Sequence, residues 1–229
     1  MLFTVCRRCS QTKTHNRLHE NARHHANQIL TLQDQFGPID IYLFDQLLRG
    51  RIQPGMRVLD AGCGFGRNLV YFLRSGYEVF AADADPASIA EVRRLAASLA
   101  PNLPAENFRE EPVERMSFEA GFADVVVSSA VLHFCRNDMQ FADMVNAMWR
   151  ALKPGGLLFC RLATTIGMES RMKPLRDGRY LLPDGTERYL VNEEILMRFT
   201  RMLGGTLVDP LKTTVVQDQR CMTTWVLQK

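Results

Sequence analysis

The feature that most constrains the fold is a regular alternation of strand-like and helix-like segments between residues 56 and 162. Short apolar runs alternate with segments in which apolar residues recur at three- and four-residue spacing. The runs predict strands over residues 56–60, 78–82, 107–110, 122–128 and 157–162, and the periodic segments predict helices over residues 66–75, 86–100 and 138–152. This alternation is typical of parallel strand–helix–strand units. We therefore predict a doubly wound α/β fold.

Segments on either side of the alternation extend this prediction. Residues 39–48 show helical spacing before the first strand, and a further helix is expected over residues 193–203. Strand-like runs at residues 206–216 and 220–227 would add an antiparallel pair at the end of the chain. The sheet is therefore predicted to be mostly parallel and seven-stranded, with an antiparallel C-terminal strand.

The first 25 residues differ in composition from the rest of the chain. Five Arg or Lys residues stand there against one Glu, a charge of +4, so that the remaining residues carry −1 of the total of +3. We expect residues 1–25 to form a basic, loosely ordered extension and residues 26–229 to form a single domain. Cys6 and Cys9, with histidines downstream, leave zinc binding open as an alternative, and the composition also fits a transit peptide. We predict no metal site.

Composition narrows the class of function. No apolar run approaches the ~18 residues of a membrane-spanning helix. The near-neutral charge after residue 25 offers no basic surface for nucleic acid, which we therefore do not expect as the substrate. The other four cysteines are widely spaced in apolar segments, as is usual for reduced thiols. We accordingly expect a cytoplasmic protein.

The turn after the first expected strand, VLDAGCGFGRN, indicates the ligand. A dinucleotide-binding turn has the pattern G-x-G-x-x-G, but Arg67 stands where its third glycine should be. Asp60 would also repel a pyrophosphate and would favour a cationic ligand. S-adenosylmethionine carries an ammonium and a sulfonium group, and glycines at Gly62 and Gly64 would let it approach the backbone closely. The turn therefore predicts S-adenosylmethionine as the cofactor.

A second acid supports this cofactor. Asp83 closes the second expected strand in VFAADADP and follows Gly62 by 21 positions. An acid at this place in a doubly wound sheet reaches ribose hydroxyl groups. Asp85, one step further into the loop, is the alternative.

Four segments together resemble the class I S-adenosylmethionine-dependent methyltransferases. VLDAGCGFGRN, VFAADADP, FADVVVSSAVLHF and LKPGGLLF stand in the order and spacing of that family over about residues 50–163. The first of them most resembles the tellurite-resistance and related small-molecule methyltransferases. The resemblance implies a Rossmann-like methyltransferase fold and methyl transfer to a small-molecule acceptor. An RNA or protein methyltransferase and a catalytically silent cofactor-binding scaffold remain alternatives.

The resemblance also implies roles for particular residues. The methionine end of the cofactor would meet Asp60, Gly62, Cys63 and Gly64, the ribose would meet Asp83, the adenine would meet Ala84 and Val113, and the methyl group would lie near Ser129. The family usually places an acid for the adenine amino group where this chain has Pro112. Glu111 is a substitute if the loop is shifted.

Residues for the acceptor come from three places. His133 follows the fourth expected strand and is the candidate general base, although a packed, structural histidine is the common alternative. Arg67 opens the helix at the site and is assigned to substrate or to packing. Residues 164–191 are expected to form a substrate lid with a hairpin around residues 183–186. Its Arg171 and Arg179 are candidates for an anionic substrate, unless they belong to a solvated loop.

Overall fold

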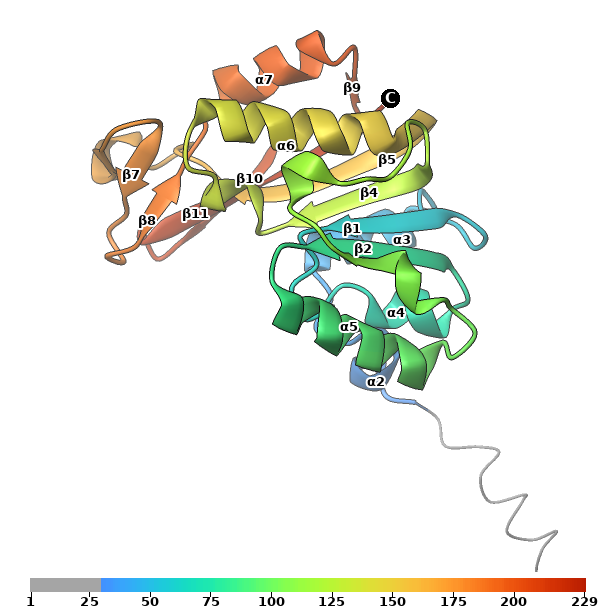
Figure 1. Cartoon of the computed structure of the whole chain (residues 1–229). Helices are drawn as coiled ribbons and strands as arrows, with labels where there is room; N and C mark the ends of the chain where they lie inside the picture. The colour runs from blue at the N-terminus through green and yellow to red at the C-terminus, as the bar shows by residue number, and fades with distance from the viewer. Residues whose placement is uncertain (1–29) are drawn as a thin grey trace, which may run out of the picture. The chain divides into compact units, whose positions relative to one another are not determined.

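The computed structural model describes residues 30–229 (Figure 1). The expected extension at residues 1–25, with Cys6 and Cys9, lies outside the described residues. Helix α2 (Leu32–Phe36) precedes α3 (Ile41–Leu48). The carboxylate of Asp40 caps α3 by accepting a hydrogen bond from the Tyr42 N–H at 3.0 Å, the usual role of Asp at a helix N-terminus. Residues 36–229 form one compact unit.

The central sheet has the predicted architecture. Its strands are β1 (Arg57–Ala61), β2 (Glu78–Asp83), β3 (Phe108–Glu110), β4 (Ala123–Ser129), β5 (Leu152–Ala163), β9 (Thr206–Leu207), β10 (Lys212–Val216) and β11 (Arg220–Gln228). Seven of them follow the order β10-β11-β5-β4-β1-β2-β3, and β9 pairs with β11. The pairs from β3 to β5 are parallel, whereas β11 pairs antiparallel with β5, β9 and β10. The expected Rossmann-like fold with an antiparallel C-terminal end is confirmed.

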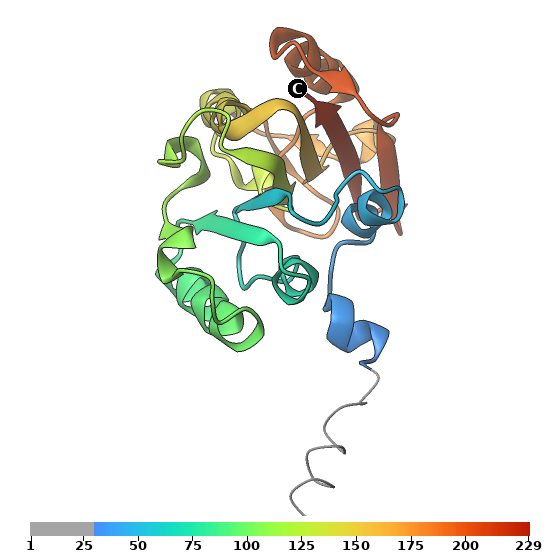
Figure 2. The ribbon, with the colours of Figure 1, turned by 90° about the vertical axis from the view of Figure 1, so that its right-hand side faces the viewer.

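Helices cover both faces of this sheet, as Figures 1 and 2 show. The remaining helices are α4 (Val70–Arg74), α5 (Pro86–Leu99), α6 (Asp138–Ala151) and α7 (Glu193–Met202). In β4, Val125 and Val127 pack in the core that contains residues of α3, α4 and α5, whereas Val126 packs in the core of α6 and α7. Successive side chains of a strand point to opposite faces, so a strand covered on both faces is apolar throughout.

Three boundaries differ from the sequence prediction. The expected helix at residues 66–75 is reduced to α4, because the chain turns through the glycine-rich segment first. The expected strand at residues 157–162 is longer, because β5 begins at Leu152, directly after α6, whose N-cap Asn137 accepts from the Gln140 N–H at 3.0 Å. The expected strand at residues 206–216 divides into β9 and β10 at Pro210, which has no N–H to donate to a ladder.

A second, small antiparallel sheet follows β5. It contains β6 (Lys173–Pro174), β7 (Arg179–Leu181) and β8 (Glu187–Tyr189), and the turn between β7 and β8 is the hairpin that the sequence predicts. The Tyr189 hydroxyl of β8 donates to the Asp138 carboxylate at 2.8 Å. This bond ties the small sheet to the start of α6.

Candidate functional site

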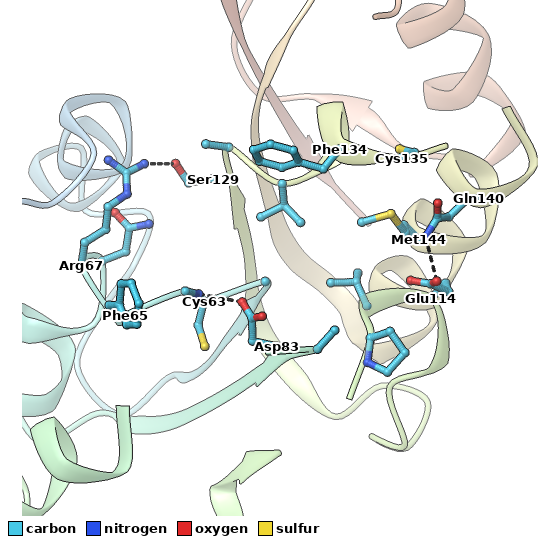
Figure 3. Close-up of a pocket in the computed structure, with 18 of the residues that line it drawn as sticks. Cys63, Phe65, Arg67, Asp83, Glu114, Ser129, Phe134, Cys135, Gln140 and Met144 are labelled. Carbon is cyan, nitrogen blue, oxygen red and sulfur yellow. Dashed lines mark hydrogen bonds between the residues drawn. The ribbon is translucent and has the colours of Figure 1, made fainter. Parts of the chain in front are cut away.

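A pocket of about 700 Å³ opens beyond the carboxyl ends of β1, β2 and β4 (Figure 3). Ligands of doubly wound sheets bind at this edge, at the point where the connections after two neighbouring strands run to opposite faces of the sheet. Of the residues expected at the cofactor, the pocket is lined by Gly62, Cys63, Gly64, Asp83, Ala84, Val113 and Ser129. Arg67 also lines it. Asp60, His133, Arg171 and Arg179 are not among its lining residues.

The three glycines of the turn serve different purposes. All have positive φ, which favours glycine. A Cβ at Gly62 would lie 2.6 Å from the side chain of Val131, and a Cβ at Gly66 would lie 3.1 Å from Val92 of α5. A Cβ at Gly64 would meet no atom within 4 Å. Gly62 and Gly66 therefore permit close packing, whereas Gly64 leaves open space where a ligand can approach the backbone.

Asp60, near the carboxyl end of β1 and two positions before Gly62, is a buried acid. Its side chain is 1% exposed, and neither carboxylate oxygen has a hydrogen-bond partner among residues 30–229. Burial raises the pKa of Asp60 to about 7, Arg67 opposes this rise and Asp83 adds to it. A buried carboxylate without a partner is costly. A cationic ligand group close to it would favour the ionised form.

Asp83 and Asp85 take separate roles. The Asp83 carboxylate accepts from the N–H groups of Gly64 at 2.8 Å and Asp85 at 3.0 Å, which fixes it against the glycine turn at the pocket wall. The Asp85 carboxylate caps α5 by accepting from the N–H groups of Ala87 and Ser88. Each Asp83 oxygen retains a second lone pair for a ligand hydroxyl. Asp85 is absent from the pocket lining, so the geometry favours Asp83 for ribose contact.

The opposite wall begins at the loop after β3. Pro112 and Val113 line the pocket there, at the start of the short 3-10 helix η2 (Val113–Arg115). Both carboxylate oxygens of Glu111 accept from Ser117, from its N–H at 2.8 Å and its hydroxyl at 2.5 Å. Glu111 does not line the pocket, so the alternative of a shifted loop receives no support.

A charged network that the sequence did not reveal surrounds Ser129. The Ser129 hydroxyl donates to Asp40 Oδ2 at 3.0 Å and accepts from an Arg67 NH2 group at 2.8 Å. Arg161 of β5 also donates to Asp40 Oδ2, at 3.2 Å. Asp40 is 3% exposed and offsets part of the charge of two arginines, of which Arg67 lines the pocket. In the sequence, Asp40 can be recognised only as a possible N-cap of the helix that follows it.

His133 belongs to the short 3-10 helix η3 (Leu132–Phe134) and is 7% exposed. Its Nδ1 accepts from the Ala163 N–H at 3.2 Å. Burial lowers the pKa of His133 to about 4, with further lowering by Arg188, Arg161 and Arg220. This environment supports a packing role and gives the expectation of a general base no support.

Arg171 and Arg179, the two arginines expected in a substrate lid, form ion pairs with acidic residues of this chain. Arg171 pairs with Asp218 at 2.9 Å, with both side chains largely exposed. Arg179 lies 3.6 Å from Glu187 and donates to the backbone carbonyl of Cys135, a pocket residue, at 3.4 Å. Arg179 therefore contacts the pocket wall from behind, and Arg171 does not.

Other side chains line the pocket that no sequence motif predicted. Phe65 and Phe134 line it although they are 67% and 60% exposed, and they present aromatic surface to the pocket. Glu114, Gln140 and Met144 line its far side (Figure 3). Cys63 is buried, and burial together with Asp60 and Asp83 raises the pKa of its thiol, which disfavours a thiolate nucleophile.

Two kinds of feature are absent from residues 30–229. No group of three or more His, Cys, Asp or Glu side chains in this part of the chain is arranged to hold a metal ion. No helix there has both the length and the apolar character to cross a membrane. The four cysteines after residue 29, namely Cys63, Cys135, Cys160 and Cys221, are free and buried.

Sequence comparison finds relatives for the central part of the chain. Residues 59–160 match the family model described as "Methyltransferase domain". A malonyl-[acyl-carrier protein] O-methyltransferase of Enterobacter lignolyticus is 33% identical over 102 residues, which are 44% of this chain and 37% of the relative. The chain spans less than half the length of the first curated relatives it matches.

Solved structures extend the comparison to the whole fold. The 1,6-didemethyltoxoflavin-N1-methyltransferase of Burkholderia thailandensis, solved with its substrate and S-adenosylhomocysteine, is 18% identical with a TM-score of 0.62, covering 99% of this chain and 93% of that one. The [4+2]-cyclase SpnF is 13% identical with a TM-score of 0.66, covering 95% of this chain and 94% of that one. Because a cyclase has the same fold, the fold alone does not decide the reaction. Residues 59–160 thus match a methyltransferase domain model, and the chain has the Rossmann-like fold of the class I methyltransferases.

Proposed function

We propose that this chain is an S-adenosylmethionine-dependent methyltransferase that acts on a small molecule. The observation that carries the proposal is the buried carboxylate of Asp60, which has no hydrogen-bond partner among residues 30–229 and interacts electrostatically with Cys63, Arg67 and Asp83 of the pocket wall. A dinucleotide would bring a pyrophosphate to this carboxylate, and like charges repel. The cofactor would bring an ammonium and a sulfonium, and when bound it supplies an already activated methyl group.

The residues of the pocket fit the parts of this cofactor in order. Asp60 would balance the charge of the methionine end, with Gly62, Cys63 and Gly64 beside it. Asp83 would accept from ribose hydroxyl groups, since its carboxylate is held at the wall by the glycine turn. The small apolar surfaces of Ala84 and Val113 would contact the adenine. Ser129 would lie near the transferred methyl group.

The acceptor would occupy the part of the pocket near Arg67 and Ser129. Arg67 has 42% of its side chain exposed, and its guanidinium is held by Ser129 and Asp40. Phe65 and Phe134 offer apolar surface near it. These features suit a small acceptor that combines an anionic group with a flat or apolar body. Arg179 would act indirectly, by supporting the loop at Cys135.

The surroundings of Ser129 also bear on the acceptor atom. The Ser129 hydroxyl already donates to Asp40, and His133 is turned toward the Ala163 N–H. A nucleophile that arrives ionised needs no base, so the chain's own task is to align it and exclude water. A carboxylate, or an oxyanion such as selenite or tellurite, meets this condition. The resemblance of the first motif to tellurite-resistance methyltransferases supports the second choice.

Two other functions have weaker support. Methylation of RNA would need a basic surface, and residues 26–229 have a net charge of −1. A silent cofactor-binding scaffold would use Asp60 and Asp83 in the same way but would not need the part of the pocket near Arg67 and Ser129. Both alternatives predict no transfer to a small molecule.

The test is transfer of a labelled methyl group from S-adenosylmethionine to a panel of small carboxylates, selenite, tellurite and bulk RNA. We expect turnover on one or more anionic small molecules. Loss of turnover in Arg67→Leu, with Arg171→Leu as the matched control that keeps it, would assign the anionic group to Arg67. Methylation of RNA alone would contradict the proposal.

A further inference from the structure

Asp40 is a buried acid that joins the network at Ser129 from the N-cap of α3, outside the pocket lining. Its side chain is 1% exposed. Oδ1 accepts from the Tyr42 N–H at 3.0 Å, as a helix cap does. Oδ2 accepts from the Ser129 hydroxyl at 3.0 Å and from Arg161 Nη1 at 3.2 Å, and it lies 3.6 Å from Arg67 Nη2. One carboxylate oxygen thus serves the helix, and the other contacts side chains of the pocket wall.

The two residues after the glycine turn, Arg67 and Asn68, both reach Asp40. Asn68 is 3% exposed, and its Oδ1 accepts from the backbone N–H of Asp40 at 3.0 Å. This bond holds the N-terminus of α3 against the pocket, since Arg67 and Asn68 both line it. Figure 3 shows the Arg67 guanidinium directed toward Ser129, to which it donates at 2.8 Å. The backbone of Asp40 is therefore held by a group other than those that its carboxylate orients.

The carboxylate of Asp40 determines which way the Ser129 hydroxyl points. A carboxylate only accepts and a guanidinium only donates, so the hydroxyl hydrogen goes to Asp40 while Arg67 donates to the oxygen. One lone pair of that oxygen remains for a ligand. Among residues 30–229, Nε and Nη1 of Arg67 have no hydrogen-bond partner, so they remain as donors. The wall therefore presents donors for an anionic group beside an acceptor of fixed direction.

We propose that Asp40 is a positioning residue for methyl transfer, which holds Arg67 and Ser129 in the directions that align an anionic acceptor with the methyl group. This inference rests on the proposed function. Asp40 does not line the pocket, so it acts through these two side chains and touches neither ligand. Alignment affects the rate of the bound complex, because only a well-oriented nucleophile reaches the transition state.

Asp40→Asn separates alignment from helix capping. Asn is as good an N-cap as Asp, so the Tyr42 N–H keeps its acceptor. The amide then places an NH2 group, a donor, where Oδ2 now faces the donors of Ser129, Arg161 and Arg67. These side chains lose the group that orients them. Removal of a negative charge beside two arginines also makes the wall more positive, so an anionic acceptor still binds.

The test measures kcat and KM for the small anion of the panel that the wild-type chain methylates fastest, at saturating S-adenosylmethionine. We expect Asp40→Asn to lower kcat by at least about tenfold, the scale of a misplaced reactant. Its KM should be unchanged or lower. Arg67→Leu removes donors for the acceptor itself and should raise KM by at least about tenfold. The two variants are thus expected to affect different constants.

Binding measured without turnover gives an independent readout. Calorimetric titration of the same anion into the complex with S-adenosylhomocysteine should show that Asp40→Asn binds it at least as tightly as the wild type. The affinity of Asp40→Asn for S-adenosylhomocysteine itself should be unchanged, because Asp40 does not line the pocket. A merely structural role would weaken binding of both ligands together with the rate.

Matched variants exclude a general effect of the substitution. Asp85→Asn makes the same change at the N-cap of α5, outside the pocket lining, and it should leave kcat and KM unchanged. Ser129→Ala should lower kcat, and the double variant with Asp40→Asn should lose less than the product of the two single effects, since Asp40 acts partly through this hydroxyl. If Asp40→Asn does not fold, Asp40→Ser, another uncharged N-cap residue, takes its place with the same expectations.

Three results would overturn the inference and leave the proposed function intact. They are an unchanged kcat in folded Asp40→Asn, a higher KM with unchanged kcat in that variant, and an equal fall of kcat in Asp85→Asn. If the wild-type chain methylates no small anion, the proposed function fails and the inference fails with it. That outcome is recognised from the wild-type chain alone, so the two failures are distinguishable.

Discussion

At Asp60, the proposed contribution to ligand binding would come at the expense of stability. Its folded pKa of about 7 is above the ordinary value of 3.8. Between these values the folded chain holds a proton that the unfolded chain has lost, so the contribution of Asp60 to stability falls as pH rises through this range. A bound cation would reverse this cost. In the proposed function, a cationic ligand would therefore gain affinity from an arrangement that the ligand-free chain tolerates poorly.

Asp60→Asn should remove this pH dependence. Relative to the wild type, the free energy of unfolding of the variant should increase between pH 5 and pH 8 by on the order of 2 kcal/mol. Urea unfolding without ligand at the two pH values measures it. Asp209→Asn is the control, because a hydrogen bond from Arg51 lowers the pKa of Asp209 and keeps it ionised in both states over this range. Its difference from the wild type should not change with pH, and parallel behaviour of the two variants would contradict the assignment.

His133 gives a second prediction at the residue scale. An Asn can replace its Nδ1 as the acceptor for the Ala163 N–H, so His133→Asn should keep methyl transfer at pH 7 within about threefold. His133→Ala leaves this buried N–H unpaired and should cost about 1–3 kcal/mol in unfolding free energy. The initial rate and chemical denaturation check the two statements. A folded His133→Asn that has lost transfer more than a hundredfold would restore the role of a base.

At the scale of elements, the glycine turn combines packing with access. At Gly66 the φ is 77°, and an added Cβ would lie 3.1 Å from each of two side chains of α5, so Gly66→Ala should lower the unfolding free energy by about 1–3 kcal/mol.

At Gly64 the φ is 51° and an added Cβ would meet no atom within 4 Å, so Gly64→Ala should lower the unfolding free energy by about 1–2 kcal/mol through backbone strain alone. Its methyl group would occupy the ligand space, and affinity for S-adenosylhomocysteine should fall more than in Gly66→Ala. Thermal unfolding with and without ligand measures both effects. The opposite order of affinities would place the ligand elsewhere.

The same turn shows what sequence could and could not predict about an element. Its D-x-G-x-G-x-G pattern is local, and the pocket lies where that pattern predicts. The predicted start of the helix at residue 66 was wrong, because α4 begins only at Val70. The turn before it brings Gly66 close to Val92 and Leu95 of α5, a tertiary contact that the local sequence does not show. The hairpin of β7 and β8 was predicted from its turn residues. Its tie to α6 through Tyr189 and Asp138 needed the tertiary structure.

At the scale of the whole molecule, the alternation of segments determined the sheet, since parallel strands need helical crossovers. The acceptor side of the pocket followed no such rule. Asp40, Ser129 and Arg161 come from α3's N-cap, β4 and β5, and Asp40 is separated from the other two by 89 and 121 positions. Charges so distant in sequence carry no spacing signal. The position of the glycine turn and Asp83 at the pocket was therefore predictable, and the network that joins Asp40 and Arg161 to Ser129 was not.

Calorimetric titration of the full chain with S-adenosylmethionine and with NAD tests the central claim most directly. The account predicts that S-adenosylmethionine binds at one site per chain, that NAD does not bind, and that Asp60→Asn weakens the binding by roughly 1–3 kcal/mol. Each part follows from a carboxylate that favours a cation and repels a pyrophosphate. Binding of NAD in preference to S-adenosylmethionine, or unchanged affinity in a folded Asp60→Asn chain, would contradict it.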